Sequence, residues 1–156
     1  MNIYSLLETS TILANLEVDD KVDLLNKMID VLKDQVSAAQ LKEIRESVFE
    51  REEIMSTGVG KQLAIPHGKA KSIDRNYASF AILKEAIDYD SIDDEPVKVV
   101  FLLAGPEVKN STHIKLLSRI SRLMNSSSFR ETLSNCKTSD DIYEVFRNEE
   151  EKYFNN

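Results

Sequence analysis

Residues 97–104 form a nearly continuous apolar run, and this run constrains the fold more than any other feature of the chain. All of its members except Lys98 are apolar. Such a run is typical of a strand buried in the middle of a sheet, and it is far shorter than the roughly 20 residues that a membrane span requires. Residues 77–83 are a second predicted strand, and residues 11–16 are a short third one.

Helical spacing governs the segments that follow the first strand. Between residues 20 and 33, apolar residues recur every three or four positions, at Val22, Leu25, Met28, Ile29 and Leu32. A second helix is predicted to begin at Ser37, because Ser37 and Gln40 have the spacing of a capping box. The same spacing, continued along that helix, places Arg51 on its apolar face at the C-terminal end.

The C-terminal part is predicted to be helical. Residues 111–125 form an amphipathic helix with His113 in its first turn, at the edge of the apolar stripe. Residues 129–133 are a short helical piece. Because helices and strands alternate along the chain, the fold is a layered domain of the α/β or α+β class.

The chain ends in one more predicted helix. Thr138 can cap it, with Asp141 in the capping position, and it ends near Phe146. Residues 149–156 are expected to fray. No linker or repeat divides the chain, and we therefore predict a single domain over residues 1–156, with its core at about 11–146.

One of only two histidines stands at the end of a short apolar run. Residues 63–66 are predicted to be a strand that stops at Pro66, since proline cannot continue a sheet ladder. Gly68 then permits a turn. His67 is thus expected at a strand end, where an imidazole can take up a proton or act as a nucleophile near neutral pH.

Composition excludes several classes of function. The net charge is −7, which argues against nucleic acid as the partner, because phosphate contacts need clustered lysine and arginine. An acidic surface suits either solubility or encounter with a basic protein. A single cysteine fits a reducing compartment, and the N-terminus does not have the pattern of a signal peptide. We therefore expect a cytoplasmic protein that does not insert into a membrane.

Taken alone, each candidate residue has two interpretations. His113 is either a buried structural histidine or, at the positive end of a helix, a donor to a bound anion. Arg51 is either a helix-end residue that binds C-terminal carbonyls or a planar donor for phosphate. The loop with Gly58 and Gly60 does not have the spacing of a P-loop. Metal-binding spacing is absent, and Cys136 has no neighbouring group that would lower its pKa.

A longer stretch adds a resemblance to a known family. Residues 51–68 read R-E-E-I-M-S-T-G-V-G-K-Q-L-A-I-P-H-G. This segment resembles the signature of the type-2 enzyme IIA domains of the bacterial phosphoenolpyruvate-dependent phosphotransferase system (PTS), which include fructose, mannitol and nitrogen-regulatory members. The similarity extends through residues 87–89, 96–101 and 112–117, and it covers about residues 11–146.

The resemblance implies a fold, a reaction and partners. The fold is α/β: a mixed, largely parallel β-sheet with helices on both faces. His67 matches the histidine that accepts a phosphoryl group from an HPr-like phosphocarrier protein, and Arg51 and His113 match positions that contact the phosphoryl group or orient the active histidine. The acceptor of the group is an enzyme IIB or a regulatory protein target. This chemistry requires no metal or organic cofactor.

Two roles of such a carrier stay open. One is a regulatory protein of the nitrogen branch, whose phosphorylation state controls its binding to other proteins. The other is a sugar-specific subunit that passes phosphate to an enzyme IIB for import. A degenerate domain without phosphoryl chemistry is disfavoured, because His67, Arg51 and His113 are all present.

Overall fold

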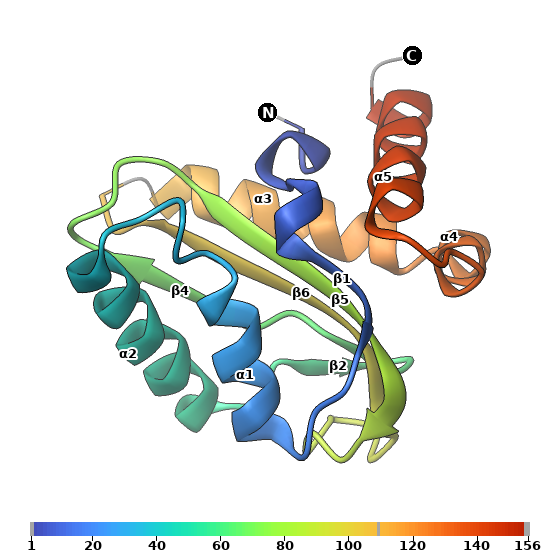
Figure 1. The fold of residues 1–156 in the computed structure, drawn as a ribbon, viewed down its shortest axis with the longest axis horizontal. Helices are drawn as coiled ribbons and strands as arrows, with labels where there is room; N and C mark the ends of the chain where they lie inside the picture. Colours follow the sequence, from blue (N-terminus) through green and yellow to red (C-terminus); the bar gives the residue numbers. More distant parts are fainter. Residues whose placement is uncertain (1, 109, 155–156) are drawn as a thin grey trace.

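A six-stranded mixed sheet lies between two layers of helices. The computed structural model describes residues 2–108 and 110–154. The strands follow the order β1-β5-β6-β3-β2, and β4 also pairs with β6. Helices α1 and α2 cover one face of the sheet, whereas α3 and α5 lie on the other (Figure 1). The α/β class that the resemblance implied is thus confirmed.

The bounds of the elements agree with most of the sequence prediction. The strands are β1 (Ile12–Leu16), β2 (Gly58–Gly60), β3 (Leu63–Ala64), β4 (His67–Ala70), β5 (Tyr77–Ile87) and β6 (Val97–Pro106). The helices are α1 (Lys21–Asp30), α2 (Ala38–Ile54), α3 (Asn110–Met124), α4 (Ser127–Ser134) and α5 (Ser139–Phe154). Two short 3₁₀ turns precede β1, η1 (Tyr4–Leu6) and η2 (Thr9–Thr11).

Strand β6 is the central strand that its apolar sequence predicted. It pairs antiparallel with β5 and parallel with both β3 and β4. Its side chains alternate between the faces, so Phe101 and Leu103 join the core under α3 and α5, whereas Val100 and Leu102 join the core under α1 and α2. Helices on both faces explain why a strand here carries apolar residues at consecutive positions.

Side-chain caps mark where three helices begin, and the caps of α2 and α5 were predicted from the sequence. Asp20 accepts a hydrogen bond from the backbone N–H of Asp23 at 2.8 Å and caps α1. Ser37 and Gln40 form the predicted capping box of α2, at 3.1 and 2.9 Å. The hydroxyl of Thr138 accepts from the N–H of Asp141 at 3.1 Å, at the start of α5.

The prediction that residues 149–156 fray is wrong for residues 149–154, which continue α5. Glu150 is fully buried. Its carboxylate accepts hydrogen bonds from the N–H groups of Ile3 at 2.7 Å and Tyr4 at 2.5 Å, and it pairs with Arg119 at 3.0 Å. These long-range contacts hold the last turns of α5 in place. Residues 155–156 lie outside the described part of the chain.

The strand predicted over residues 63–66 does stop before His67, since β3 ends at Ala64, but the turn predicted at Gly68 is wrong. The chain does not turn away at Gly68 but continues as β4, whose first residue is His67. Pro66 leaves the ladder without one N–H donor, yet its carbonyl still accepts from the N–H of Leu103 at 3.1 Å. Within residues 2–108 and 110–154, no helix has the length and apolar character that crossing a bilayer requires.

Candidate functional site

His67 is the first residue of β4, and its ring is held by a backbone carbonyl two residues earlier. Its Nδ1 lies 2.9 Å from the carbonyl oxygen of Ile65. A carbonyl can only accept a hydrogen bond, so Nδ1 is the nitrogen that carries the proton. The other ring nitrogen, Nε2, is left with a lone pair. The side chain is half-buried, which leaves this nitrogen at the boundary between the interior and the surface.

The surroundings of His67 favour the uncharged ring. Burial lowers the pKa of His67 below its ordinary value, and the positive charges of Arg51 and Lys69 lower it further. The Ile65 carbonyl and the charge of Glu52 act in the opposite direction without reversing the shift. An imidazole that stays neutral near pH 7 keeps the lone pair that a nucleophile needs.

His113 stands beside His67 in the first turn of α3. The two ring centroids are 5.7 Å apart, with the ring planes at 53°. His113 is only 3% exposed, and among the described residues neither of its ring nitrogens has a hydrogen-bond partner. Burial, followed by the positive charges of His67 and Lys69, lowers the pKa of His113 to about 4. Two unsatisfied buried nitrogens are costly, so this histidine does not behave as a satisfied core residue.

Close packing of α2 on β4 brings Arg51 toward His67. A side chain on Gly68 would stand 2.8 Å from both the hydroxyl of Ser47 and the backbone N of Val48, so only glycine allows α2 to lie so near. The hydroxyl of Ser47 also accepts from the N–H of Lys69 at 2.8 Å. Arg51 follows Ser47 by one helical turn, which accounts for its effect on the pKa of His67.

Arg51 combines the two interpretations drawn from the sequence. One guanidinium nitrogen, Nη1, donates to the carbonyl oxygen of Met55 at 2.8 Å, which is the contact expected of a helix-end residue. Its charge nevertheless acts on His67. A guanidinium has five N–H donors, so the contact with Met55 leaves others for an anion.

Glu52 is a buried residue of α2 that was not predicted from the sequence. Ile44, Val48 and Glu52 are four residues apart, and all three are buried on one face of α2. Glu52 accepts hydrogen bonds from the backbone N–H of Thr57 at 2.7 Å and from its hydroxyl at 2.5 Å. The same spacing could have revealed Glu52, had an acidic residue been accepted on an apolar face.

Two further groups complete the partners of Glu52. Tyr89 donates its hydroxyl hydrogen bond at 2.9 Å, and the ammonium of Lys21 lies at 3.0 Å. Burial acts to raise the pKa of Glu52, but the hydrogen bonds from Thr57 and the charge of Lys21 hold it below its usual value. Burial and the charge of Glu52 raise the pKa of Tyr89. This buried carboxylate joins α1, α2 and the Thr57 loop, and its charge acts on His67.

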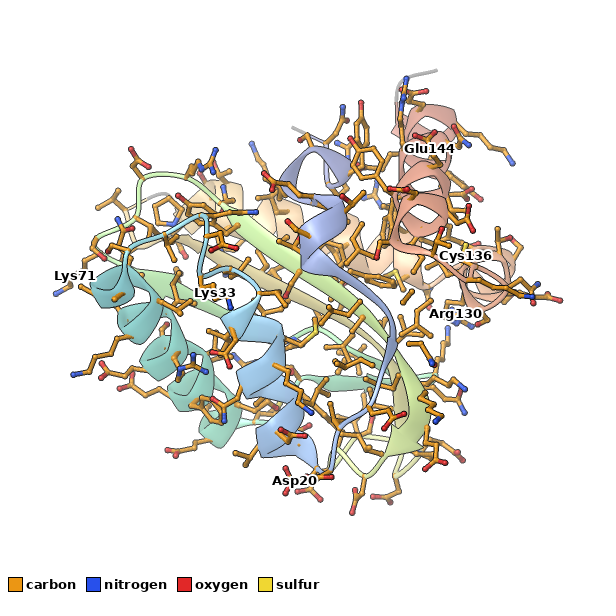
Figure 2. The ribbon with its side chains drawn as sticks, in the orientation of Figure 1. Asp20, Lys33, Lys71, Arg130, Cys136 and Glu144 are labelled. Atoms are coloured by element: carbon orange, nitrogen blue, oxygen red, sulfur yellow. The ribbon has the colours of Figure 1, made fainter. Side chains whose placement is uncertain are left out.

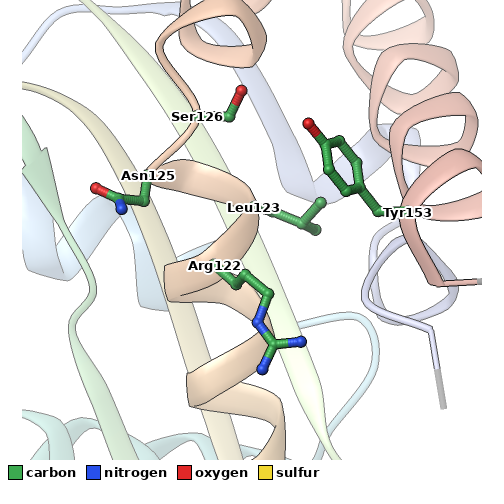
Figure 3. Close-up of a pocket in the computed structure, with 5 residues that line it drawn as sticks. All are labelled: Arg122, Leu123, Asn125, Ser126 and Tyr153. Carbon is green, nitrogen blue, oxygen red and sulfur yellow. The ribbon is translucent and has the colours of Figure 1, made fainter.

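The described residues form a pocket away from the two histidines. A pocket of about 240 Å³ between the end of α3 and α5 is lined by Arg122, Leu123, Asn125, Ser126 and Tyr153 (Figure 3). Neither histidine belongs to it.

Cys136 lies apart from these groups, in the segment between α4 and α5 (Figure 2). Partial burial, followed by the charge of Asp141, raises the pKa of its thiol. A raised pKa keeps the thiol protonated and weakly nucleophilic. The prediction that Cys136 has no group nearby to lower its pKa is confirmed.

Comparisons with known proteins identify relatives over nearly the whole chain. The model of the family described as "Phosphoenolpyruvate-dependent sugar phosphotransferase system, EIIA 2" matches residues 5–149. The chain is 32% identical over 145 residues to the nitrogen regulatory protein of Bradyrhizobium diazoefficiens, and the match covers 93% of this chain and 94% of that protein.

A second relative is much longer than this chain. The chain is 33% identical over 145 residues to the PTS system fructose-specific EIIABC component of Bacillus subtilis, a match that spans 93% of this chain but 23% of that protein. Among solved structures, the nitrogen regulatory protein IIA-Ntr from Neisseria meningitidis has a TM-score of 0.85 at 28% identity, covering 92% of this chain and 98% of that one.

Proposed function

The chain belongs to the EIIA 2 family of the phosphoenolpyruvate-dependent sugar phosphotransferase system, and on this basis we propose that it carries a phosphoryl group on Nε2 of His67. One observation carries this assignment most directly. The proton of His67 is held on Nδ1 by the Ile65 carbonyl, and the lone pair of Nε2 is therefore available beside the buried ring of His113.

The proposed step moves a phosphoryl group between two histidines. The lone pair of Nε2 attacks the phosphorus of a phosphohistidine on the donor protein, so that a new N–P bond forms. The donor's N–P bond breaks, and its electron pair returns to the donor's imidazole. No proton has to leave the attacking nitrogen. The transition state of such a transfer is loose, so positioning and charge stabilisation supply the catalysis.

Arg51 and His113 supply the stabilisation in this proposal. The equatorial oxygens of the transferring group carry negative charge, which N–H donors at fixed positions stabilise. The guanidinium of Arg51 is always charged and planar. His113 brings a buried ring without hydrogen-bond partners among the described residues, so contact with a phosphoryl oxygen would satisfy a nitrogen that is otherwise unsatisfied.

Exposed apolar side chains next to these residues support a protein donor. Ile54 and Met55 follow Arg51 and are 80% and 64% exposed, and Ile114 follows His113 and is 57% exposed. Apolar groups that gather around a reactive residue are typical of the centre of a protein interface. We assign an HPr-like phosphocarrier, in the cytoplasm, as the donor and an enzyme IIB or a regulatory protein as the downstream partner.

The nitrogen-regulatory role is the one that we favour. It rests on the similarity to IIA-Ntr from Neisseria meningitidis and on the match to nearly the full length of a nitrogen regulatory protein. The fructose-specific relative supports the alternative, in which His67 passes the group to an enzyme IIB for sugar import. Transfer of label onward to a purified IIB supports import, whereas protein binding that changes with phosphorylation supports regulation.

Transfer of radiolabelled phosphate tests the carrier itself. Phosphoenolpyruvate, enzyme I and either HPr or a nitrogen-branch paralogue are mixed with the wild-type protein, with His67→Ala or with the control Cys136→Ser. We expect acid-labile, base-stable label on the wild type and the control but none on His67→Ala. Label on His67→Ala, or no label on the wild type from either donor, would contradict the assignment.

A further inference from the structure

Two buried polar side chains behind the site have unused hydrogen-bonding capacity. Asn76, just before β5, is 8% exposed, and its Oδ1 has no partner among the described residues. His113 is likewise buried, and within the same residues neither Nδ1 nor Nε2 has a partner. Groups of this kind are rare in folded proteins, because each unsatisfied group costs free energy.

Both groups converge on one point beside β6. A Cβ placed on Gly105 would stand 2.6 Å from Oδ1 of Asn76 and 2.7 Å from Nδ1 of His113. The amide oxygen and the ring nitrogen therefore both lie beside the bare backbone of Gly105, although they do not form a hydrogen bond with each other in this structure. Any larger residue at this position would fill the space between them. Nδ1 is thus the ring nitrogen on the side of Gly105, and Nε2 is the nitrogen that remains for another partner.

We infer that Asn76 is a positioning residue for His113, and that its Oδ1 accepts the Nδ1–H hydrogen bond of a His113 ring that becomes doubly protonated when His67 carries a phosphoryl group. This inference rests on the proposed function. It assigns the acceptor that holds His113 in place, and it assigns the protonation state in which His113 binds a phosphoryl oxygen.

The need for a second proton follows from the chemistry of the ring. A neutral imidazole has one N–H, and when Nδ1 donates it to Asn76, Nε2 presents a lone pair. That lone pair would repel a phosphoryl oxygen. Uptake of one proton from bulk water at Nε2 turns the repulsion into a charge-assisted hydrogen bond. No other bond in the protein has to form or break.

The charge on His67, beside His113, becomes negative when His67 receives the phosphoryl group. In the free protein, burial and the charges of His67 and Lys69 on β4 oppose protonation, as does the positive N-terminal end of α3 itself. Lys69 is directed to the start of α3, where its ammonium donates to Oδ1 of Asn110 at 2.6 Å. The phosphoryl oxygens carry about −1.5 to −2 charges, and the positive ring of His67, which keeps its Nδ1–H, offsets about one of them. The centroid of that ring lies 5.7 Å from that of His113.

Two substitutions at Asn76 separate positioning from simple packing. Asn76→Leu keeps a similar shape but removes the acceptor. Asn76→Asp keeps the acceptor and adds a negative charge, so it should raise the pKa of His113 even in the unphosphorylated protein. Gln35→Leu is the matched control, because its Nε2 is also a buried amide atom without a partner among the described residues, and Gln35 lines the same cavity as Asn76.

The measurement is NMR of ¹⁵N-histidine-labelled full chain across a pH titration, before and after phosphorylation through phosphoenolpyruvate, enzyme I and phosphocarrier. We expect the Nδ1–H tautomer of His113 in the free wild type. Phosphorylation should raise its pKa by roughly 2 or more, by Coulomb's law at short range. Asn76→Leu should lose that tautomer preference and at least half of the rise, whereas Gln35→Leu should behave as the wild type.

Failure of the inference is distinguishable from failure of the carrier function. A wild type that carries phosphate on His67 while His113 stays neutral, or an Asn76→Leu variant that titrates as the wild type does, would overturn the role of Asn76. If no phosphohistidine forms at all, the proposed function fails, and the tautomer of His113 in the free protein still decides about Asn76. If Asn76→Leu does not fold, the rise expected for Asn76→Asp decides: its absence refutes the inference.

Discussion

His67 and His113 differ from surface histidines because burial disfavours a positive charge on both rings. For His67 this environment preserves a nucleophilic lone pair. For His113 it makes folding itself sensitive to pH, since the ring is more easily protonated when the chain unfolds. A group whose pKa is lower in the folded state contributes stability above its unfolded pKa, and that contribution is lost as the pH falls.

We expect the free energy of unfolding to depend on pH through His113. Its pKa is about 4 in the folded protein and about 6.5 in an unfolded chain, so its contribution should be complete above pH 6.5. About 2 to 3 kcal/mol should disappear between pH 6.5 and 4.5. Urea unfolding at both values measures this loss. His113→Gln should show a smaller loss by that amount, and equal losses in the two proteins would refute the prediction.

The residues of the site could be predicted only in part. His67, Arg51 and His113 were selected from one resemblance and from helical spacing, and the structure brings the two histidines together. Asn76 and Glu52 were missed. Asn76 reaches the site only because β6 carries a glycine opposite it, which is a long-range relation that no local pattern contains. Glu52 was missed because an acidic residue contradicts the expected apolar face.

At the scale of elements, the contact of α2 with β4 places the site. It is an unusually close approach for a helix and a strand, since Gly68 meets the Ser47 hydroxyl and the backbone N of Val48 with no room for a Cβ. Packing at native density leaves no slack for an added methyl group. A change at Gly68 is therefore transmitted to Arg51, which lies one turn beyond Ser47 on the same helix.

Gly68→Ala should push α2 away from β4. We expect a loss of about 1 to 3 kcal/mol of stability from overpacking, together with slower phosphoryl acceptance because Arg51 moves relative to His67. Urea unfolding and the initial rate of labelling measure the two effects. Ser47→Gly in the same background should not restore the wild-type values, because the backbone N of Val48 stays in the way. Unchanged stability and rate in Gly68→Ala would refute this account of the packing.

Element prediction succeeded where the signal was local and failed where it was not. The apolar run of β6 and the capping residues Ser37 and Thr138 act within a few positions of the structure that they specify. Strand β4 has no apolar alternation of its own, and it is a strand because it pairs with β6 in parallel. Such pairing depends on residues more than thirty positions away, and tertiary context then overrides local preference.

At the scale of the whole molecule, Glu150 joins three distant parts of the chain. Its carboxylate binds the backbone of Ile3 and Tyr4 in η1 and the guanidinium of Arg119 in α3. Figure 1 shows η1 and the far end of α5 close together on one side of the molecule, at a distance from β4. The stabilising contacts of Glu150 therefore lie at a distance from His67, the residue of the proposed chemistry.

Glu150→Ala should therefore destabilise the protein without altering phosphoryl acceptance at low temperature. Removal of the carboxylate leaves the buried N–H of Ile3 and the partly buried N–H of Tyr4 without their acceptor and removes the ion pair with Arg119. We expect a loss of about 3 to 5 kcal/mol. Glu151→Ala is the matched control, since Glu151 is exposed and its pair with Arg147 should contribute less than about 1 kcal/mol. Equal stability of the two variants in urea would contradict this role of Glu150.

The contact of Glu150 with Ile3 also has a consequence for biosynthesis. The two residues are 147 positions apart, so the acceptor for the N–H groups of η1 is made long after η1 itself. Chains grow from the N-terminus at about 5–20 residues per second, and η1 has no carboxylate to bind throughout that time. The core under α3 is likewise incomplete until Phe146 of α5 has been made. Phe146 packs against Phe80, Phe101 and Phe129. This half of the domain therefore closes only after α5 has been made.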